Sequence, residues 1–217
     1  MLQDLLEFLV QWDGHDSQLT SKKRFCNHQT SFRLFQNHIQ NLLAAITSIS
    51  LFYNLEKISK DIFLNYEIPD GRGDISKIKF KNRLINFVDE SYNSNPLSLK
   101  TALINFANKK INRNTKHVLL GDMLELGNDS TKHHMYIGKM INKLNIDKVH
   151  IYGNYVKKTY EVVKKNKRGL ILNDISKIKD LINKRINNND YLMIKGSNST
   201  GLFKQSQLLK LNKLNAL

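Results

Sequence analysis

The sequence predicts an α/β protein: a mainly parallel, doubly wound, Rossmann-like sheet domain preceded by a small and mostly helical segment. From Lys77 onward, short runs of β-branched and aromatic residues alternate with segments of helical apolar spacing. A proline and two glycines stand together between Pro69 and Gly73, where the periodicity changes. The chain has 217 residues, 41% of them hydrophobic, which suffices for one ordinary domain and a smaller piece. We therefore expect one domain over residues 1–70 and a second over residues 71–217.

Helices are the elements predicted within the first 70 residues. Leucines at helical spacing favour a short amphipathic helix over Leu2–Leu9, whereas Trp12–Thr30 is polar and has no steady period. Residues 31–55 contain a broad stripe of leucine, isoleucine and alanine, which predicts a helix with a buried face. A second short helix is expected around residues 58–66.

Six strands and the helices between them make up the expected sheet domain. The strands are expected near residues 78–81, 85–88, 117–120, 149–152, 170–172 and 191–194. The intervening helices are marked by apolar residues at helical spacing over residues 99–106, 137–144, 156–163 and 175–186. Strands that alternate with helices of this length favour a parallel sheet with right-handed crossovers.

The junction that follows the strand at residues 85–88 organises this domain. Asn95 followed by Pro96 is typical of a helix N-cap with proline in the first turn. In an open α/β sheet, ligands bind where the carboxyl end of a strand meets the N-terminus of the next helix. The glycine fingerprint of a dinucleotide site is not present, since Gly71 and Gly73 have no third glycine at position 76. A P-loop is not present either, since the sole Gly-Lys pair, Gly138-Lys139, has no glycine five residues before it.

Composition and charge exclude several classes of protein. The net charge is +15, but the lysines are scattered through every segment, which favours a biased composition over nucleic-acid binding. A single cysteine, Cys26, excludes an internal disulfide, and no histidine stands at a zinc-binding spacing from it, so we expect no metal site. The opening Met1–Val10 carries acids and is too short to cross a bilayer, so we expect a cytoplasmic protein without membrane insertion.

Three segments of the predicted sheet domain resemble the motifs of a known family. They are Asp89–Pro96 (DESYNSNP), Leu120–Gly127 (LGDMLELG) with Ser130 and His134, and Lys195–Ser199 (KGSNS). In this order, over about 110 residues, they are similar to the C-terminal domain of the Mur ligases. The resemblance extends weakly back to about Asn37 and does not cover the first thirty or so residues.

The resemblance implies a role in peptidoglycan synthesis, where the most similar family member joins D-alanyl-D-alanine to UDP-N-acetylmuramoyl-tripeptide with ATP. In the complete enzymes, ATP and Mg²⁺ are held by a P-loop in a central domain, of which residues 1–70 would be a remnant. Because the P-loop is missing here, the resemblance implies a partial ligase, inactive alone, that holds no cofactor by itself. A separate P-loop-bearing polypeptide is therefore an expected partner.

Positions that match the family motifs receive candidate roles from the resemblance. Arg72 lies in a Gly-Arg-Gly segment that resembles the family hinge, and it is the candidate catalytic residue because the arginine fork suits phosphate oxygens. The candidate nucleotide-binding residues are Asn41, Arg72, Asp89, Glu90, Asn93 and Asn95. The candidate substrate-binding residues are Asp122, Glu125, His134, Lys195, Gly196, Ser197 and Asn198. Asn37-His38 reverses a His-Asn pair of the family, and Asn41 matches better.

Structural roles compete with several of these assignments. Asn93 and Asn95 also suit a turn and a helix cap, and His134 also suits packing at a helix edge. Asp122 and Glu125 also suit a solvated loop. For the chain as a whole, the alternative is a noncatalytic α/β module that binds nucleotides or RNA, or a decayed product of a split gene.

Overall fold

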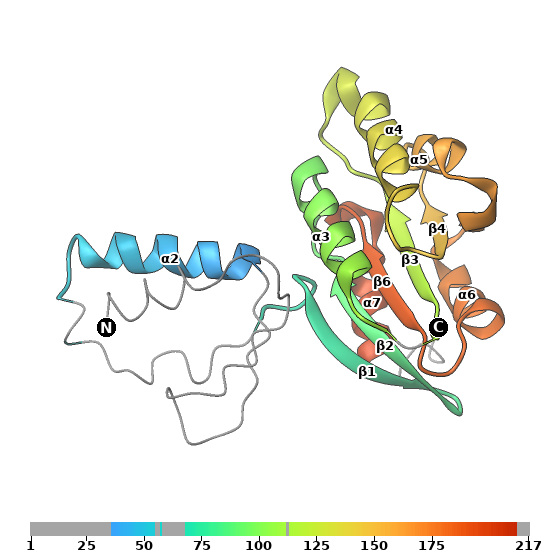
Figure 1. Ribbon diagram of the computed structural model, residues 1–217, viewed down its shortest axis with the longest axis horizontal. Helices are drawn as coiled ribbons and strands as arrows, with labels where there is room; N and C mark the ends of the chain where they lie inside the picture. The colour runs from blue at the N-terminus through green and yellow to red at the C-terminus, as the bar shows by residue number, and fades with distance from the viewer. Residues whose placement is uncertain (1–35, 55–56, 58–67, 112, 212–217) are drawn as a thin grey trace. The chain divides into compact units, whose positions relative to one another are not determined.

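Figure 1 shows the computed structural model of the chain, which describes residues 36–54, 57, 68–111 and 113–211. The chain divides into two units, residues 1–67 and residues 68–217. The helices expected at Leu2–Leu9 and at residues 58–66 lie outside the described residues. In the described part of the chain, no helix is long and apolar enough to cross a membrane.

The first unit contributes one described helix, α2 (Gln36–Ser50), which falls inside the segment predicted to be helical. Asn41 is exposed on it. Ala44, Ala45 and Ile49 are also exposed, so the predicted burial of the apolar stripe is wrong at these positions. A helix buries its apolar face only where another element packs against it, and the described residues of this unit include no such element.

The second unit is built on a six-stranded sheet with the strand order β1-β2-β6-β3-β4-β5. The strands are β1 (Asp74–Phe80), β2 (Arg83–Glu90), β3 (Lys116–Gly121), β4 (Lys148–Tyr152), β5 (Arg168–Leu172) and β6 (Tyr191–Lys195). β1 pairs antiparallel with β2, and the other neighbouring strands are parallel. The predicted mainly parallel α/β class is therefore confirmed. β1 begins earlier than predicted and ends before Lys81, which takes a φ of 53° in the turn to β2.

Five described helices cover the two faces of this sheet (Figure 1). α3 (Pro96–Asn108), α4 (Ser130–Ile141) and α5 (Lys157–Val162) pack on one face, whereas α6 (Ile178–Arg185) and α7 (Leu202–Lys210) pack on the other. From β5 the chain returns through α6 to β6, which inserts between β2 and β3. The sheet is thus doubly wound, and its strand order reverses beside β6. α7 is not predicted from the sequence, because polar residues interrupt its few apolar ones.

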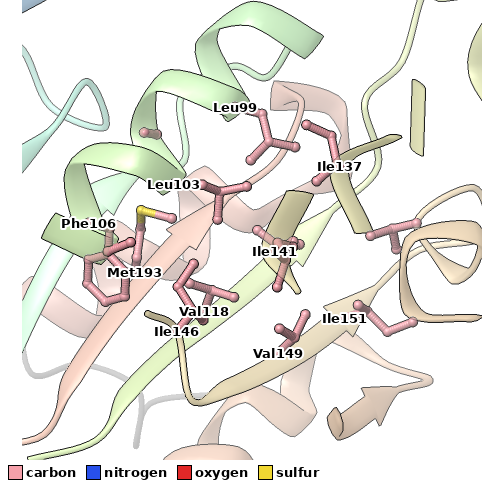
Figure 2. Packing of buried hydrophobic residues seen from close by; sticks show 14 of the residues in the cluster. Leu99, Leu103, Phe106, Val118, Ile137, Ile141, Ile146, Val149, Ile151 and Met193 are labelled. Atoms are coloured by element: carbon pink, nitrogen blue, oxygen red, sulfur yellow. The ribbon is translucent and has the colours of Figure 1, made fainter. Parts of the chain in front are cut away.

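Apolar side chains form a separate core on each face of the sheet. Figure 2 shows the first core, in which Leu103 and Phe106 of α3 and Ile141 of α4 lie over Val118 and Met193 of the strands. All five side chains are almost completely buried. Burying one side chain of this size stabilises the fold by roughly 1.5–3 kcal/mol, so the cores hold the helices on both faces.

The start of α3 follows the prediction. The side chain of Asn95 accepts a hydrogen bond from the Ser98 backbone N–H at 2.8 Å, and the Ser98 hydroxyl accepts one from the Asn95 backbone N–H at 3.1 Å. Pro96 occupies the first turn. These bonds satisfy N–H groups that the start of a helix leaves unpaired, so Asn95 acts as the N-cap.

A pair of buried histidines links β3 and β4 on the face of the sheet that α6 and α7 cover. His150 Nδ1 accepts the backbone N–H of Leu170 at 2.8 Å, so its proton lies on Nε2, which is 3.1 Å from His117 Nδ1. Burial, followed by the charges of His117 and nearby basic groups, lowers the pKa of His150 to about 3. Both residues are therefore neutral structural members of the sheet at pH 7.

Candidate functional site

The carboxyl ends of β2, β6 and β3 lie side by side at one edge of the sheet. Glu90 at the end of β2 pairs in register with Lys195 at the end of β6, and Lys195 also pairs with Leu120 of β3. The three motifs predicted from the sequence begin at these strand ends, so the fold brings them together. This edge lies at the reversal of strand order, where open α/β sheets bind their ligands.

Lys195 is a buried cation at this edge. Its side chain is 3% exposed, and Nζ lies 3.3 Å from Oε2 of Glu90, whose side chain is 15% exposed. The amine also donates a hydrogen bond to the carbonyl oxygen of Asn93 at 2.9 Å. Burial lowers the pKa of Lys195, and the carboxylate of Glu90 opposes this shift. Lys195 therefore ties the loop after β2 to the end of β6.

Ser197 connects all three motif segments. Its hydroxyl accepts the backbone N–H of Leu124 at 2.9 Å and donates to the carbonyl oxygen of Ser94 at 3.3 Å. Its own N–H donates to the carbonyl oxygen of Asp122 at 2.9 Å. The predicted substrate-binding serine thus holds the loops of the site in place.

Gly196 is required by close packing between β6 and β3. A Cβ atom at this position would lie 3.1 Å from the Cα of Gly121 and 2.8 Å from a side-chain carbon of Leu202. Asn198, two residues later, is exposed. Four residues of the last motif were predicted to bind substrate, and Asn198 is the exposed one among them.

Asp122 is buried, and its carboxylate holds the loop between β4 and α5. Oδ1 accepts the backbone N–H of Val156 at 2.7 Å, and Oδ2 accepts that of Asn154 at 3.0 Å. Gly153 leaves room for this carboxylate, since a Cβ atom there would lie 2.4 Å from Oδ1. The interpretation of Asp122 as a solvated loop acid is therefore wrong. Glu125, in contrast, is exposed and has a φ of 63°.

The difference between Asp122 and Glu125 can be tested by replacing each with alanine and measuring the stability of the protein. Asp122→Ala is expected to lower the free energy of unfolding by about 2 kcal/mol, because two backbone N–H groups lose a charged acceptor. The matched control Glu125→Ala should change it by less than about 0.5 kcal/mol. Urea unfolding followed by circular dichroism measures both values. Wild-type stability of Asp122→Ala would contradict the structural role and leave the carboxylate for a ligand.

His134 is buried and uses both ring nitrogens within the chain. Nε2 accepts the backbone N–H of Met123 at 3.2 Å, so Nδ1 carries the proton and donates it to the carbonyl oxygen of Ser130 at 2.8 Å. Burial lowers the pKa of His134, which favours this neutral form. The packing interpretation therefore describes His134 in this structure, where it holds Met123 within the second motif.

The acidic and amide residues of the first motif differ in their access to solvent. Asp89 is 0% exposed and its Oδ1 accepts the backbone N–H of Ser91 at 3.1 Å, so it offers no oxygen to a ribose. Glu90 is the more accessible of the two candidate acids. Asn93 is exposed, and its side chain accepts the backbone N–H of Ser94 at 2.8 Å, as expected of a turn residue.

Arg72 lies on the same edge of the sheet domain as Lys195. Its guanidinium carbon is 4.3 Å from the centre of the Tyr92 ring, and that ring meets Phe203 of α7 edge-on at 5.4 Å. The charge of Arg72 also contributes to the lowered pKa of Lys195. An exposed guanidinium held over an aromatic ring can accept an anion such as a phosphate.

Comparison with known proteins identifies the family to which these residues belong. Residues 76–198, more than half of the chain, match the family described as the Mur ligase, glutamate ligase domain. The chain belongs to the Mur ligase family. The matched region contains the first two motifs entirely and the third up to Asn198.

Relatives of this Mur ligase chain are longer than it is. UDP-N-acetylmuramoyl-tripeptide--D-alanyl-D-alanine ligase of Rickettsia prowazekii is 26% identical over 148 residues, which are 68% of this chain and 32% of the relative. The chain thus spans about a third of the length of this curated relative.

Solved Mur ligases have the same fold. MurF ligase from Thermotoga maritima in complex with ADP matches with a TM-score of 0.63 and 22% identity, over 83% of this chain and 39% of that one. MurF from Acinetobacter baumannii matches with a TM-score of 0.61 and 22% identity, over 82% and 37%. MurC from Thermotoga maritima matches with a TM-score of 0.51 and 17% identity, over 80% and 38%.

Two residues near the carboxyl ends of these strands were not predicted from the sequence. Tyr92, under Arg72, could have been found, because it is an aromatic residue inside a polar motif. Lys210, at the end of α7, carries no signal in the sequence, since it is one lysine among many.

The residues at this edge suit phosphate oxygens better than a metal. Within the described ranges, no group of three or more His, Cys, Asp or Glu side chains could hold a metal ion. Arg72 and Glu90, by comparison, provide a cation for phosphate and an acceptor for a sugar hydroxyl.

Proposed function

We propose that residues 68–217 are the closing domain of a ligase that joins D-alanyl-D-alanine to UDP-N-acetylmuramoyl-tripeptide with ATP. The convergence of Arg72, Glu90 and Lys195 at the reversal of strand order carries this proposal. The name of the Rickettsia relative and the ADP complex of the Thermotoga structure support the choice of substrates.

The more accessible residues of this edge have proposed tasks in that reaction. The tripeptide carboxylate attacks the γ-phosphate of ATP, which breaks the bond to ADP and forms an acyl phosphate. The amine of the dipeptide then attacks the acyl carbon, loses a proton and displaces inorganic phosphate. The guanidinium of Arg72 binds phosphate oxygens as their charge develops, and Glu90 accepts a hydrogen bond from the ribose. Glu125 and Asn198 are the exposed candidates for contacts with the dipeptide.

The buried residues of the site support these exposed ones. Asp122, His134 and Ser197 fix the loops after β3 and β6 by hydrogen bonds to backbone groups. A site whose loops are held in this way keeps its exposed side chains in place as the substrate binds. We assign these three residues to positioning.

The P-loop must come from residues outside this sequence. Phosphoryl transfer depends on a backbone cradle, a lysine and Mg²⁺ around the β- and γ-phosphates, and one arginine does not replace them. The 217-residue polypeptide alone is therefore expected to show no ATP hydrolysis that depends on D-alanyl-D-alanine.

Reconstitution tests this proposal. The chain is mixed with the part of the Rickettsia prowazekii ligase that it does not match, and release of ADP is measured with both substrates. We expect activity in the mixture and none with either polypeptide alone. The control is the same Rickettsia part mixed with its own separated C-terminal domain. If the control is active and the mixture is not, the ligase proposal is wrong, and the noncatalytic module becomes the better explanation.

A further inference from the structure

The end of α7 reaches back to the segment that carries Arg72. Lys210 Nζ lies 2.9 Å from an oxygen of Asp70, 2.6 Å from one of Asp74 and 2.8 Å from one of Asp89. Asp70 and Asp74 stand on either side of Gly71-Arg72-Gly73, and Asp89 is completely buried at the end of β2. A single amine therefore holds both ends of the segment against the sheet domain.

Backbone hydrogen bonds fix the same segment. The N–H of Gly71 donates to Asp74 Oδ1 at 2.9 Å, and the N–H of Gly73 donates to the carbonyl oxygen of Asp89 at 2.7 Å. The carbonyl oxygen of Gly71 accepts the N–H of Tyr92 at 3.0 Å. Gly71 has a φ of 72° and Gly73 a φ of 102°, values that favour glycine. The segment is therefore a built part of the domain, although its composition resembles a flexible linker.

The charges of this cluster keep Lys210 protonated. Burial by itself lowers the pKa of Lys210, but hydrogen bonds from the amine to Asp74, Asp89 and Asp70 together raise it above its ordinary value. A protonated amine that is shared by three carboxylates forms a network of charge-assisted hydrogen bonds, which are stronger than neutral ones.

We propose that Lys210 is a positioning residue, which locks the Gly71–Gly73 segment by holding Asp70 and Asp74 at once and thereby sets the direction of Arg72. The lock itself follows from the contacts of this domain. The benefit to phosphate binding rests on the proposed function, so the lock and its benefit are tested separately.

Trypsin cleavage of the native full chain tests the lock. Cleavage after Arg72 reports local opening of the segment, whereas cleavage after Lys116, which is buried in β3, reports opening of the core. Lys210→Met should raise the first rate relative to the second by at least about 10-fold, and Asp70→Asn by about 3-fold. Lys204→Met, on the exposed side of α7, is the matched control and should leave the ratio unchanged.

Each result of this experiment decides for or against the lock. An unchanged ratio in Lys210→Met, or equal rises at both bonds, overturns it, because Lys210 then contributes no more than general stability. If Lys210→Met does not fold, Asp70→Asn decides, since Asp70 is 63% exposed and its loss leaves the buried contacts in place. An unchanged ratio in Asp70→Asn then overturns the proposal.

Kinetics in the reconstituted ligase test whether the lock benefits phosphate binding by Arg72. Lys210→Met should lower kcat by about 10-fold in the wild-type background and have little effect when Arg72 is already alanine. Equal losses in both backgrounds would overturn the action of Lys210 through Arg72. Failure of reconstitution itself would contradict the ligase proposal and leave the cleavage result standing.

Discussion

Arg72→Ala is expected to lower the rate of ATP turnover that depends on D-alanyl-D-alanine by about 10²-fold or more in the reconstituted ligase. The guanidinium is exposed over Tyr92 at the carboxyl edge of the sheet, where the nucleotide phosphates are proposed to bind. It would act on charge that develops during phosphoryl transfer, so the loss should appear mainly in kcat. Arg72→Lys keeps the charge without the planar fork and should give an intermediate rate.

Arg113→Ala is the matched control for this substitution. Arg113 is also exposed, but it precedes β3 and so lies toward the amino end of that strand, away from the candidate site. The control should keep the wild-type rate. Urea unfolding checks that the Arg72→Ala protein is still folded under the assay conditions, so that a lower rate reports on function and not on stability. Activity that is indifferent to Arg72→Ala would contradict the catalytic role assigned to this residue.

Separation of the buried Lys195 from the partly buried Glu90 is expected to cost about 3 kcal/mol of unfolding free energy at pH 7. Glu90→Ala leaves a buried amine without its carboxylate, and breaking such a pair costs several kcal/mol. Lys195→Met removes the amine that donates a hydrogen bond to the carbonyl oxygen of Asn93 and pairs with the carboxylate of Glu90. The double variant should lose less than the sum of the two single losses, because neither charge is then left unpaired.

An exposed ion pair on the same domain provides the comparison. Lys158 and Glu161 lie 3.0 Å apart on α5, with 46% and 58% of their side chains exposed, so Lys158→Met should cost less than about 0.5 kcal/mol. Urea unfolding of all four variants measures the difference between buried and exposed pairs. If Lys195→Met were as stable as the wild type, Lys195 would not be the structural anchor described above.

The local pattern of the chain was sufficient for most of the fold. The strand around Phe87 and the helix face of Leu99 and Phe106 follow from apolar spacing, because burial on one face of an element imposes its period on the sequence. Asn95 and Pro96 were predicted as the helix start because capping depends on neighbouring residues alone. β1 was predicted too short, and α7 was not predicted, since neither shows a clear apolar period along its length.

The sequence by itself thus determined the class of sheet, the three motif segments with Glu90 and Lys195, and the separate Gly-Arg-Gly segment with Arg72. The tertiary structure alone decided which of the candidate residues are buried: Asp89 and Asp122 became acceptors inside the domain, whereas Glu125 and Asn198 stayed exposed. The physical reason is that burial and hydrogen-bond partners come from residues far apart in the chain. Asp70 and Lys210, which meet at 2.9 Å, are separated by 140 positions, and no local pattern records such a contact.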